Sequence, residues 1–90
     1  MSLELIQKYQ ENPNLENEQA LLAVHQGFID AQAKKWKGIL PDVVIDTKAK
    51  HYAIQAFKSF DPTKANINTH LYNNISQLSR LIYANQNSHC

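Results

Sequence analysis

The stretch AIQAFKSFDPTKANINTHL, residues 53–71, decides the fold because it predicts a helix, a turn and a second helix in succession. Asp61-Pro62 ends the first of these helices, since the residue before a proline is driven out of the helical region. We expect that helix to span about Asp42 to Phe60, and the next to run from a cap at Asn68 to about Asn85. The second helix places apolar residues at 4-3-4 spacing on one face: Leu71, Ile75, Leu78 and Ile82.

Helical periodicity also covers the N-terminal part of the chain. Ser2 is expected to begin a helix that reaches about Gln10, and Asn14 a longer helix that ends at about Lys37, before Gly38. The apolar stripe expected on the longer helix is Leu21, Val24, Phe28 and Ala31, widened by Leu22, Ile29 and Trp36. The core expected around the later turn is Phe57, Phe60, Leu71, Ile75 and Leu78.

These patterns predict an all-α fold, a small bundle of about four helices whose last three share one core. Ninety residues allow a single domain, 1–90. We divide it into an N-terminal helix and linker (1–13), a helical core (14–87) and a polar tail (88–90). Only two glycines are present, which disfavours an all-β chain with its many tight turns.

The composition excludes several classes of protein. The one cysteine is the last residue, which excludes a disulfide framework and a cysteine-based zinc site. No apolar stretch approaches the roughly 18 residues of a membrane span, and no signal-peptide pattern is visible, so we expect an intracellular protein without a membrane partner.

The charge is unevenly distributed along the chain. Residues 1–33 carry five acids against one lysine, and residues 34–90 carry eight bases against three acids. A weakly basic second half suits nucleic acid or an acidic protein as partner. The charges are spread and not clustered, which favours a plain solvated surface.

The sequence holds no pattern typical of catalysis or metal binding. The four histidines include no pair at i,i+4 spacing, and the terminal His89-Cys90 pair makes a poor metal site. Asp42 and Asp46 lie one turn apart, as acids near a helix N-terminus commonly do. We therefore expect no enzyme, no cofactor and no small-molecule substrate.

The segment Lys34-Lys35-Trp36-Lys37 has two interpretations. The lysines contact phosphates while Trp36 stacks on a base, or Trp36 is buried at the helix end while the lysines stay in water.

A resemblance to a known family rests on the opening stretch and the helix after it. The phrases AFKSFDPTK (56–64), THLYNN (69–74) and LSRLIYANQN (78–87) resemble the second conserved region of bacterial sigma factors. The chain looks closest to divergent sigma-like proteins of bacteriophages, and the likeness covers roughly residues 40–87. It implies a helix-turn-helix arrangement in which the helix before the turn binds RNA polymerase and the helix after it faces promoter DNA.

The resemblance and the charges near the turn together suggest the candidate site residues. The expected DNA-binding set is Lys58, Lys64, Thr69, His70, Asn73, Asn74, Gln77 and Arg80. The expected polymerase-binding or partner-binding set is Asp46, Lys48 and Lys50. Asn73 and Asn74 stand where the family has the tryptophans that open DNA, so we expect weak binding without melting. Tyr72, the nearest aromatic, would partly substitute for these tryptophans if it faced outward, although packing beside Leu71 is the expected arrangement.

Two functions stay open. The first is a sigma-like transcription protein in the cytoplasm of a bacterial host, which binds RNA polymerase core and promoter DNA. The second is a bacteriophage virion structural or interaction protein, located in the virion with other virion proteins, which reuses the helical fold. No region for a −35 element is seen, the melting tryptophans are replaced and the chain is small, which favours the second. The VIDTKA segment (44–49), which stands in place of the family's docking phrase, keeps Asp46 but has lost other acids of that phrase. The turn phrase and the basic second half favour the first, which we prefer.

Overall fold

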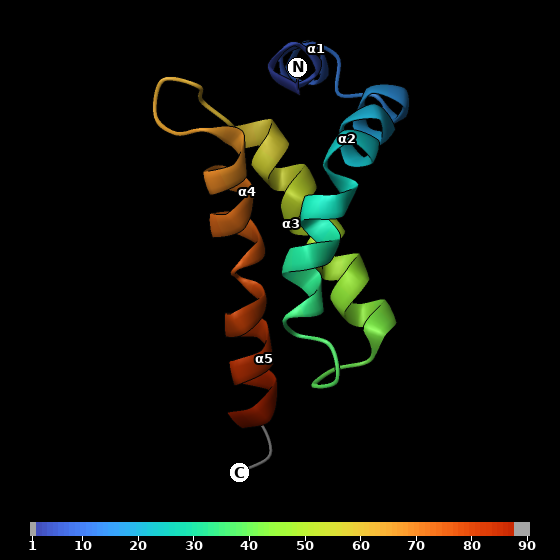
Figure 1. Ribbon diagram of the computed structural model, residues 1–90, viewed down its shortest axis with the longest axis vertical. Coiled ribbons are helices and arrows are strands. Elements are labelled where there is room, and N and C mark those ends of the chain that lie inside the picture. Colours follow the sequence, from blue (N-terminus) through green and yellow to red (C-terminus); the bar gives the residue numbers. More distant parts are fainter. Residues whose placement is uncertain (1, 88–90) are drawn as a thin grey trace.

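The computed structural model describes residues 2–87, and these residues fold into helices with no strand among them (Figure 1). The helices are α1 (Ser2–Glu11), α2 (Leu15–Lys34), α3 (Asp42–Ser59), α4 (Ile67–Ile75) and α5 (Leu78–Asn87). The prediction of a small all-α bundle is therefore confirmed. α3 packs against α1, α2 and α4, while α4 and α5 follow one another along one side of the molecule. The predicted tail, 88–90, with the His89-Cys90 pair, lies outside the described residues.

The core forms where the apolar stripes of the helices meet. All the residues predicted to form the core around the turn are buried: Phe57, Phe60, Leu71, Ile75 and Leu78. α3 also buries three alanines, Ala49, Ala53 and Ala56, whose small side chains let neighbouring helices approach closely. α1 adds the fully buried Ile6 and Tyr9. The core therefore extends beyond the last three helices to which the sequence had assigned it.

Hydrogen bonds fasten α1 to both α2 and α3. Gln10 Nε2 donates to the carbonyl oxygens of Phe57 and Phe60, at 2.9 and 3.0 Å. These carbonyls end α3, where helical C=O groups lack partners in their own helix, so the Gln10 amide caps α3 from another element. Tyr9 donates its hydroxyl to Glu18 Oε1 at 3.1 Å. Burial, and secondly this bond to the Glu18 carboxylate, raise the pKa of Tyr9 to about 12.

α2 begins where predicted, and only part of its predicted apolar stripe is buried. Asn14 caps the helix, accepting from the N–H of Asn17 at 2.8 Å. The buried positions are Asn17, Leu21, Leu22, His25, Ile29 and Ala33. Of the predicted stripe and its flanking positions, Leu21, Leu22 and Ile29 are buried, whereas Val24 is 56% exposed. Phe28 is half-buried and Ala31 is exposed. α2 carries apolar residues on more than one face, so packing against α1 and α3 decides which face is covered.

The end of α2 comes three residues earlier than expected, at Lys34. The N–H groups of Trp36 and Lys37 bond only three residues back, to Ala33 and Lys34, so the last turn tightens. Gly38 then takes a φ of 93°, a backbone conformation that favours glycine. Trp36 is half-buried and packs against the core.

The predicted fourth helix is two helices, because the α-helix ends at Ile75 and resumes at Leu78. At the break the N–H groups of Gln77 and Ser79 bond to the carbonyls of Asn74 and Ser76, again three residues back. The predicted stripe nevertheless stays buried on both sides of the break: Leu71, Ile75, Leu78 and Ile82.

The cap of α4 is Asn66, so the prediction of Asn68 is wrong. Asn66 has an extended backbone, and its Oδ1 accepts from the N–H of Thr69 at 2.9 Å. α4 therefore begins at Ile67, and Asn68 is an exposed residue of its first turn.

Candidate nucleic-acid interface

The break between α4 and α5 opens a polar hollow of about 470 Å³ on the surface. Its lining residues come from both helices and from the break itself: Asn73, Ser76, Gln77, Ser79 and Arg80. Three of the predicted DNA-binding residues, Asn73, Gln77 and Arg80, are thus brought together in one place. The two serines were not predicted.

The serines of the hollow stabilise the break itself. Ser76 Oγ donates to the carbonyl of Tyr72 at 2.7 Å, and Ser79 Oγ donates to the carbonyl of Ser76 at 2.8 Å. Serine hydroxyls that bond backward in this way compete with the helical backbone pattern. The amide groups of Asn73 and Gln77 and the guanidinium group of Arg80 therefore lie beside a backbone segment that these hydrogen bonds hold in place.

Tyr72 faces outward, which is the alternative arrangement and not the expected packing beside Leu71. Its side chain is 48% exposed, whereas Leu71 is fully buried. The position one residue after each member of a helical core stripe is turned about 100° away from the core. The residues that follow the buried Leu71, Ile75, Leu78 and Ile82 by one position are Tyr72, Ser76, Ser79 and Tyr83. The sequence pattern therefore indicates that Tyr72 faces away from the core.

The end of α2 reaches this tyrosine. Lys35 Nζ lies over the Tyr72 ring, 5.2 Å from its centroid, in a cation–π contact. The same ammonium donates to Gln32 Oε1 at 2.9 Å. For the Lys34-Lys35-Trp36-Lys37 segment, the structure agrees with the second interpretation: Trp36 packs against the core and the lysines are exposed. Lys35 in addition contacts the exposed Tyr72 ring.

Two other predicted DNA-binding residues have structural partners. His70 Nε2 lies 2.9 Å from Ser59 Oγ, and its ring centroid is 5.7 Å from that of Phe60. Asn74 Nδ2 donates to the carbonyl of His70 at 2.9 Å. Both side chains are half-buried. The His70 side chain joins the end of α3 to α4, whereas the Asn74 bond lies within α4. Thr69 is exposed in the first turn of α4.

The remaining cations of the set lie apart from the hollow. Lys58 is exposed in the last turn of α3, and Lys64 is exposed in the loop that precedes α4. Asp61 orders that loop by accepting from the N–H and the hydroxyl of Thr63, at 2.9 and 2.7 Å. The Thr63 hydroxyl and then its N–H lower the pKa of Asp61. The eight residues therefore do not form one cluster.

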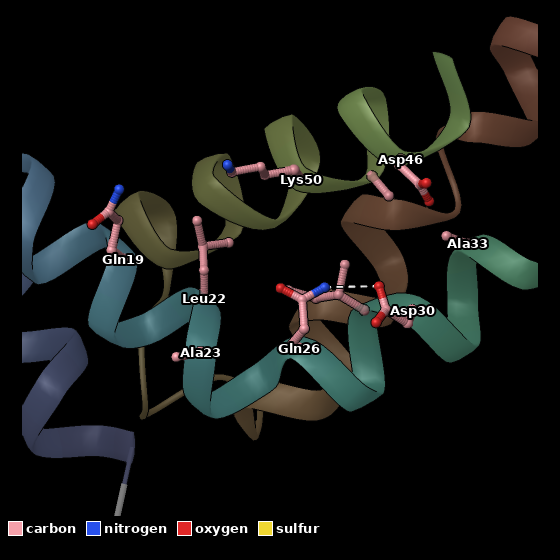
Figure 2. Close-up of a pocket in the computed structure, with 10 residues that line it drawn as sticks. Gln19, Leu22, Ala23, Gln26, Asp30, Ala33, Asp46 and Lys50 are labelled. Carbon is pink, nitrogen blue, oxygen red and sulfur yellow. Dashed lines mark hydrogen bonds between the residues drawn. The ribbon is translucent and has the colours of Figure 1, made fainter. Parts of the chain in front are cut away.

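The predicted polymerase-binding residues fall on two sides of α3. Asp46 and Lys50 line a groove of about 430 Å³ between α2 and α3, opposite Gln26 and Asp30 (Figure 2). Gln26 Nε2 donates to Asp30 Oδ1 across one turn of α2, at 2.7 Å. Lys48 instead lines a separate hollow with Val43, Val44 and Thr47.

Lys37 pairs with Asp46, one of the residues that line the groove. The sequence did not indicate this contact. The Lys37 Nζ lies 3.0 Å from Asp46 Oδ1. The hydrogen bond to Asp46, and then the carboxylates of Asp46, Asp42 and Asp30, raise the pKa of Lys37. The ion pair is exposed, so it contributes little to stability and is open to exchange with other charges.

Between residues 2 and 87, no three side chains of His, Cys, Asp or Glu come together as a metal site. None of the helices there combines the length and apolar character that crossing a bilayer requires. Comparison of the chain with protein-family models, curated proteins and solved structures gave no match.

Proposed function

We propose that this protein is a sigma-like transcription protein that binds RNA polymerase and, weakly, promoter DNA. The observation that supports this most is the polar hollow, where Asn73, Gln77 and Arg80 meet on the helices after the turn. These are residues that the resemblance and the local charge had selected for the DNA side. The proposal assigns binding to the chain, and no catalysis.

The side chains of the hollow suit nucleic acid chemically. Asn and Gln amides can pair with the edge of an adenine, and an Arg guanidinium binds phosphate or guanine. Arg80 is the one cation among the residues that line the hollow, and Lys58 and Lys64 lie elsewhere. So few phosphate contacts give a weak, salt-sensitive interaction, far from the roughly 6–10 contacts of a strong binder. Asn73 and Asn74 have no ring to trap a flipped base, so we expect no opening of the duplex.

The polymerase side of the proposal places the partner on the α2–α3 groove. Asp46 and Lys50 supply charges on its rim, and Asp30 adds another carboxylate from α2. Lys48, on the other side of α3, has no part in that contact.

Recovery of polymerase by the tagged protein tests this function. The full chain is used as bait for purified bacterial RNA polymerase core, with an ordinary sigma factor as positive control. We expect recovery of core that the double variant D46A/K50A reduces and that K48A leaves unchanged. Failure to recover core where the ordinary sigma factor succeeds would contradict the proposal.

The second candidate is a virion structural or interaction protein. The observation in its favour is the division of the candidate residues: His70 and Asn74 serve internal packing, and Lys48 is separated from Asp46 and Lys50. Recovery of capsid or tail proteins in place of polymerase from infected host cells would support it.

A further inference from the structure

We propose that Lys35 and Tyr72 form a nucleotide-binding unit for single-stranded nucleic acid, in which Tyr72 stacks on a base and Lys35 binds the adjoining phosphate. This inference rests on the proposed function for the location of the DNA side, and it adds α2 to that surface.

The geometry brings a cation and an exposed ring together from distant parts of the sequence. Lys35 Nζ lies 5.2 Å from the centroid of the Tyr72 ring, and half of the tyrosine is accessible. The bond from Lys35 to Gln32 Oε1 holds the ammonium at this place, and the bond from Ser76 to the Tyr72 carbonyl fixes the backbone below the ring. Both groups therefore stand ready at the surface without any rearrangement of the helices.

A nucleotide competes well for both groups. Every base has a π face, so stacking on an aromatic side chain is tolerant of sequence. A cation–π contact at an exposed site is weak, so Lys35 can leave the ring for a phosphate oxygen. The phosphate of a stacked nucleotide is covalently tied to its base, which brings it within reach of the long lysine side chain.

The unit lies beside the polar hollow. Asn73 on α4 and Ser76 just after that helix line the hollow that Arg80 completes. A strand that stacks one base on Tyr72 can place its next nucleotide against these polar groups. A duplex keeps its bases stacked on one another and so offers no free face to the ring. The unit thus favours single strands over duplex.

Fluorescence anisotropy with the full chain tests the unit. The probes are labelled oligo-dT and oligo-U of about ten nucleotides and a duplex of the same length, in about 0.05 M salt. We expect Tyr72→Leu to weaken single-strand binding about tenfold, while Tyr72→Phe, which keeps the ring, stays within about twofold of wild type. Lys35→Gln should weaken binding and lower the log–log salt slope by about 0.7, and Lys35→Arg should restore both. Comparable affinity for oligo-dT and oligo-U supports a unit that needs only a base and a phosphate.

Arg80→Gln separates this inference from the proposed function. If Arg80→Gln weakens DNA binding while Tyr72→Leu does not, the unit is wrong and the proposed DNA side stands. If Tyr72→Leu weakens single-strand binding but the protein recovers no polymerase, the unit stands and the proposed function falls. Equal affinity for duplex and single strands, or no binding by the wild type in about 0.05 M salt, overturns the unit.

Discussion

His25 shows how one residue can make stability depend on pH. It is 7% exposed, its ring centroid lies 5.4 Å from that of Phe57, and its Nε2 has no hydrogen-bond partner. Burial lowers the pKa of His25, because a charged imidazole is disfavoured away from water. His25 therefore binds a proton less readily in the folded protein than in the unfolded chain.

We expect the protein to lose stability as the pH falls through about 6.5, the pKa of an unperturbed histidine. Below that value the unfolded chain binds more protons than the folded one, so stability rises with pH across this range. His25→Leu should flatten the change in melting temperature between about pH 7.5 and 5.5. The control is His51→Leu, at an exposed site, which should keep the wild-type slope. A slope that both variants share with wild type would assign the effect to other groups.

The helices show which local patterns fix an element and which do not. The 4-3-4 stripe predicted the burial of Leu71, Ile75 and Leu78 because one apolar residue per turn leaves a single face to cover. The break at Ser76 and Gln77 was not predicted, since neither residue is a glycine or proline; two serine-to-carbonyl bonds accompany it. The groove on α2 was missed because it depends on which face of that helix packs against α3.

The cap of α4 provides a matched pair of variants. Asn66 and Asn68 are the same residue type two positions apart, so composition alone did not separate them. Asn66→Ala removes the oxygen that accepts from Thr69 and should cost about 1 kcal/mol of unfolding free energy. Asn68→Ala, in an exposed position, should stay within about 0.5 kcal/mol of wild type. Urea unfolding of both variants measures the difference, and an equal loss in the two would return the cap to Asn68.

At the scale of the whole molecule, α1 packs into the same core as the other helices, so we expect it to unfold together with them. The sequence division set 1–13 apart from a core of 14–87, because Pro13 interrupts the helical pattern. The structure places Ile6 and Tyr9 in the core and uses Gln10 to cap α3. A helix-breaking segment in the sequence predicts where a helix ends. It does not predict whether that helix packs against the other helices.

Deletion of residues 1–12 should therefore unfold most of the protein at room temperature. Loss of a buried residue the size of Ile6 or Tyr9 costs about 2–5 kcal/mol, and two such losses approach the total stability of a domain, about 5–15 kcal/mol. Circular dichroism and urea unfolding measure the effect. The control replaces the exposed Glu4 and Lys8 with alanine, which keeps the helix and its buried face. A deletion variant with the same unfolding midpoint as wild type would show that 14–87 folds alone.

The polar hollow is lined by two helices, α4 and α5, which meet at the break at Ser76 and Gln77 and pack to different extents against α3. α4 packs extensively against α3, whereas α5 touches it sparsely. Segments with few tertiary contacts open at a lower free-energy cost than the molecule as a whole. When α5 opens, Arg80 leaves while Asn73 and Tyr72 stay on α4. We therefore expect the amide hydrogens of α5 to exchange faster than those of α4, and a nucleic acid that bridges both helices to slow exchange in α5.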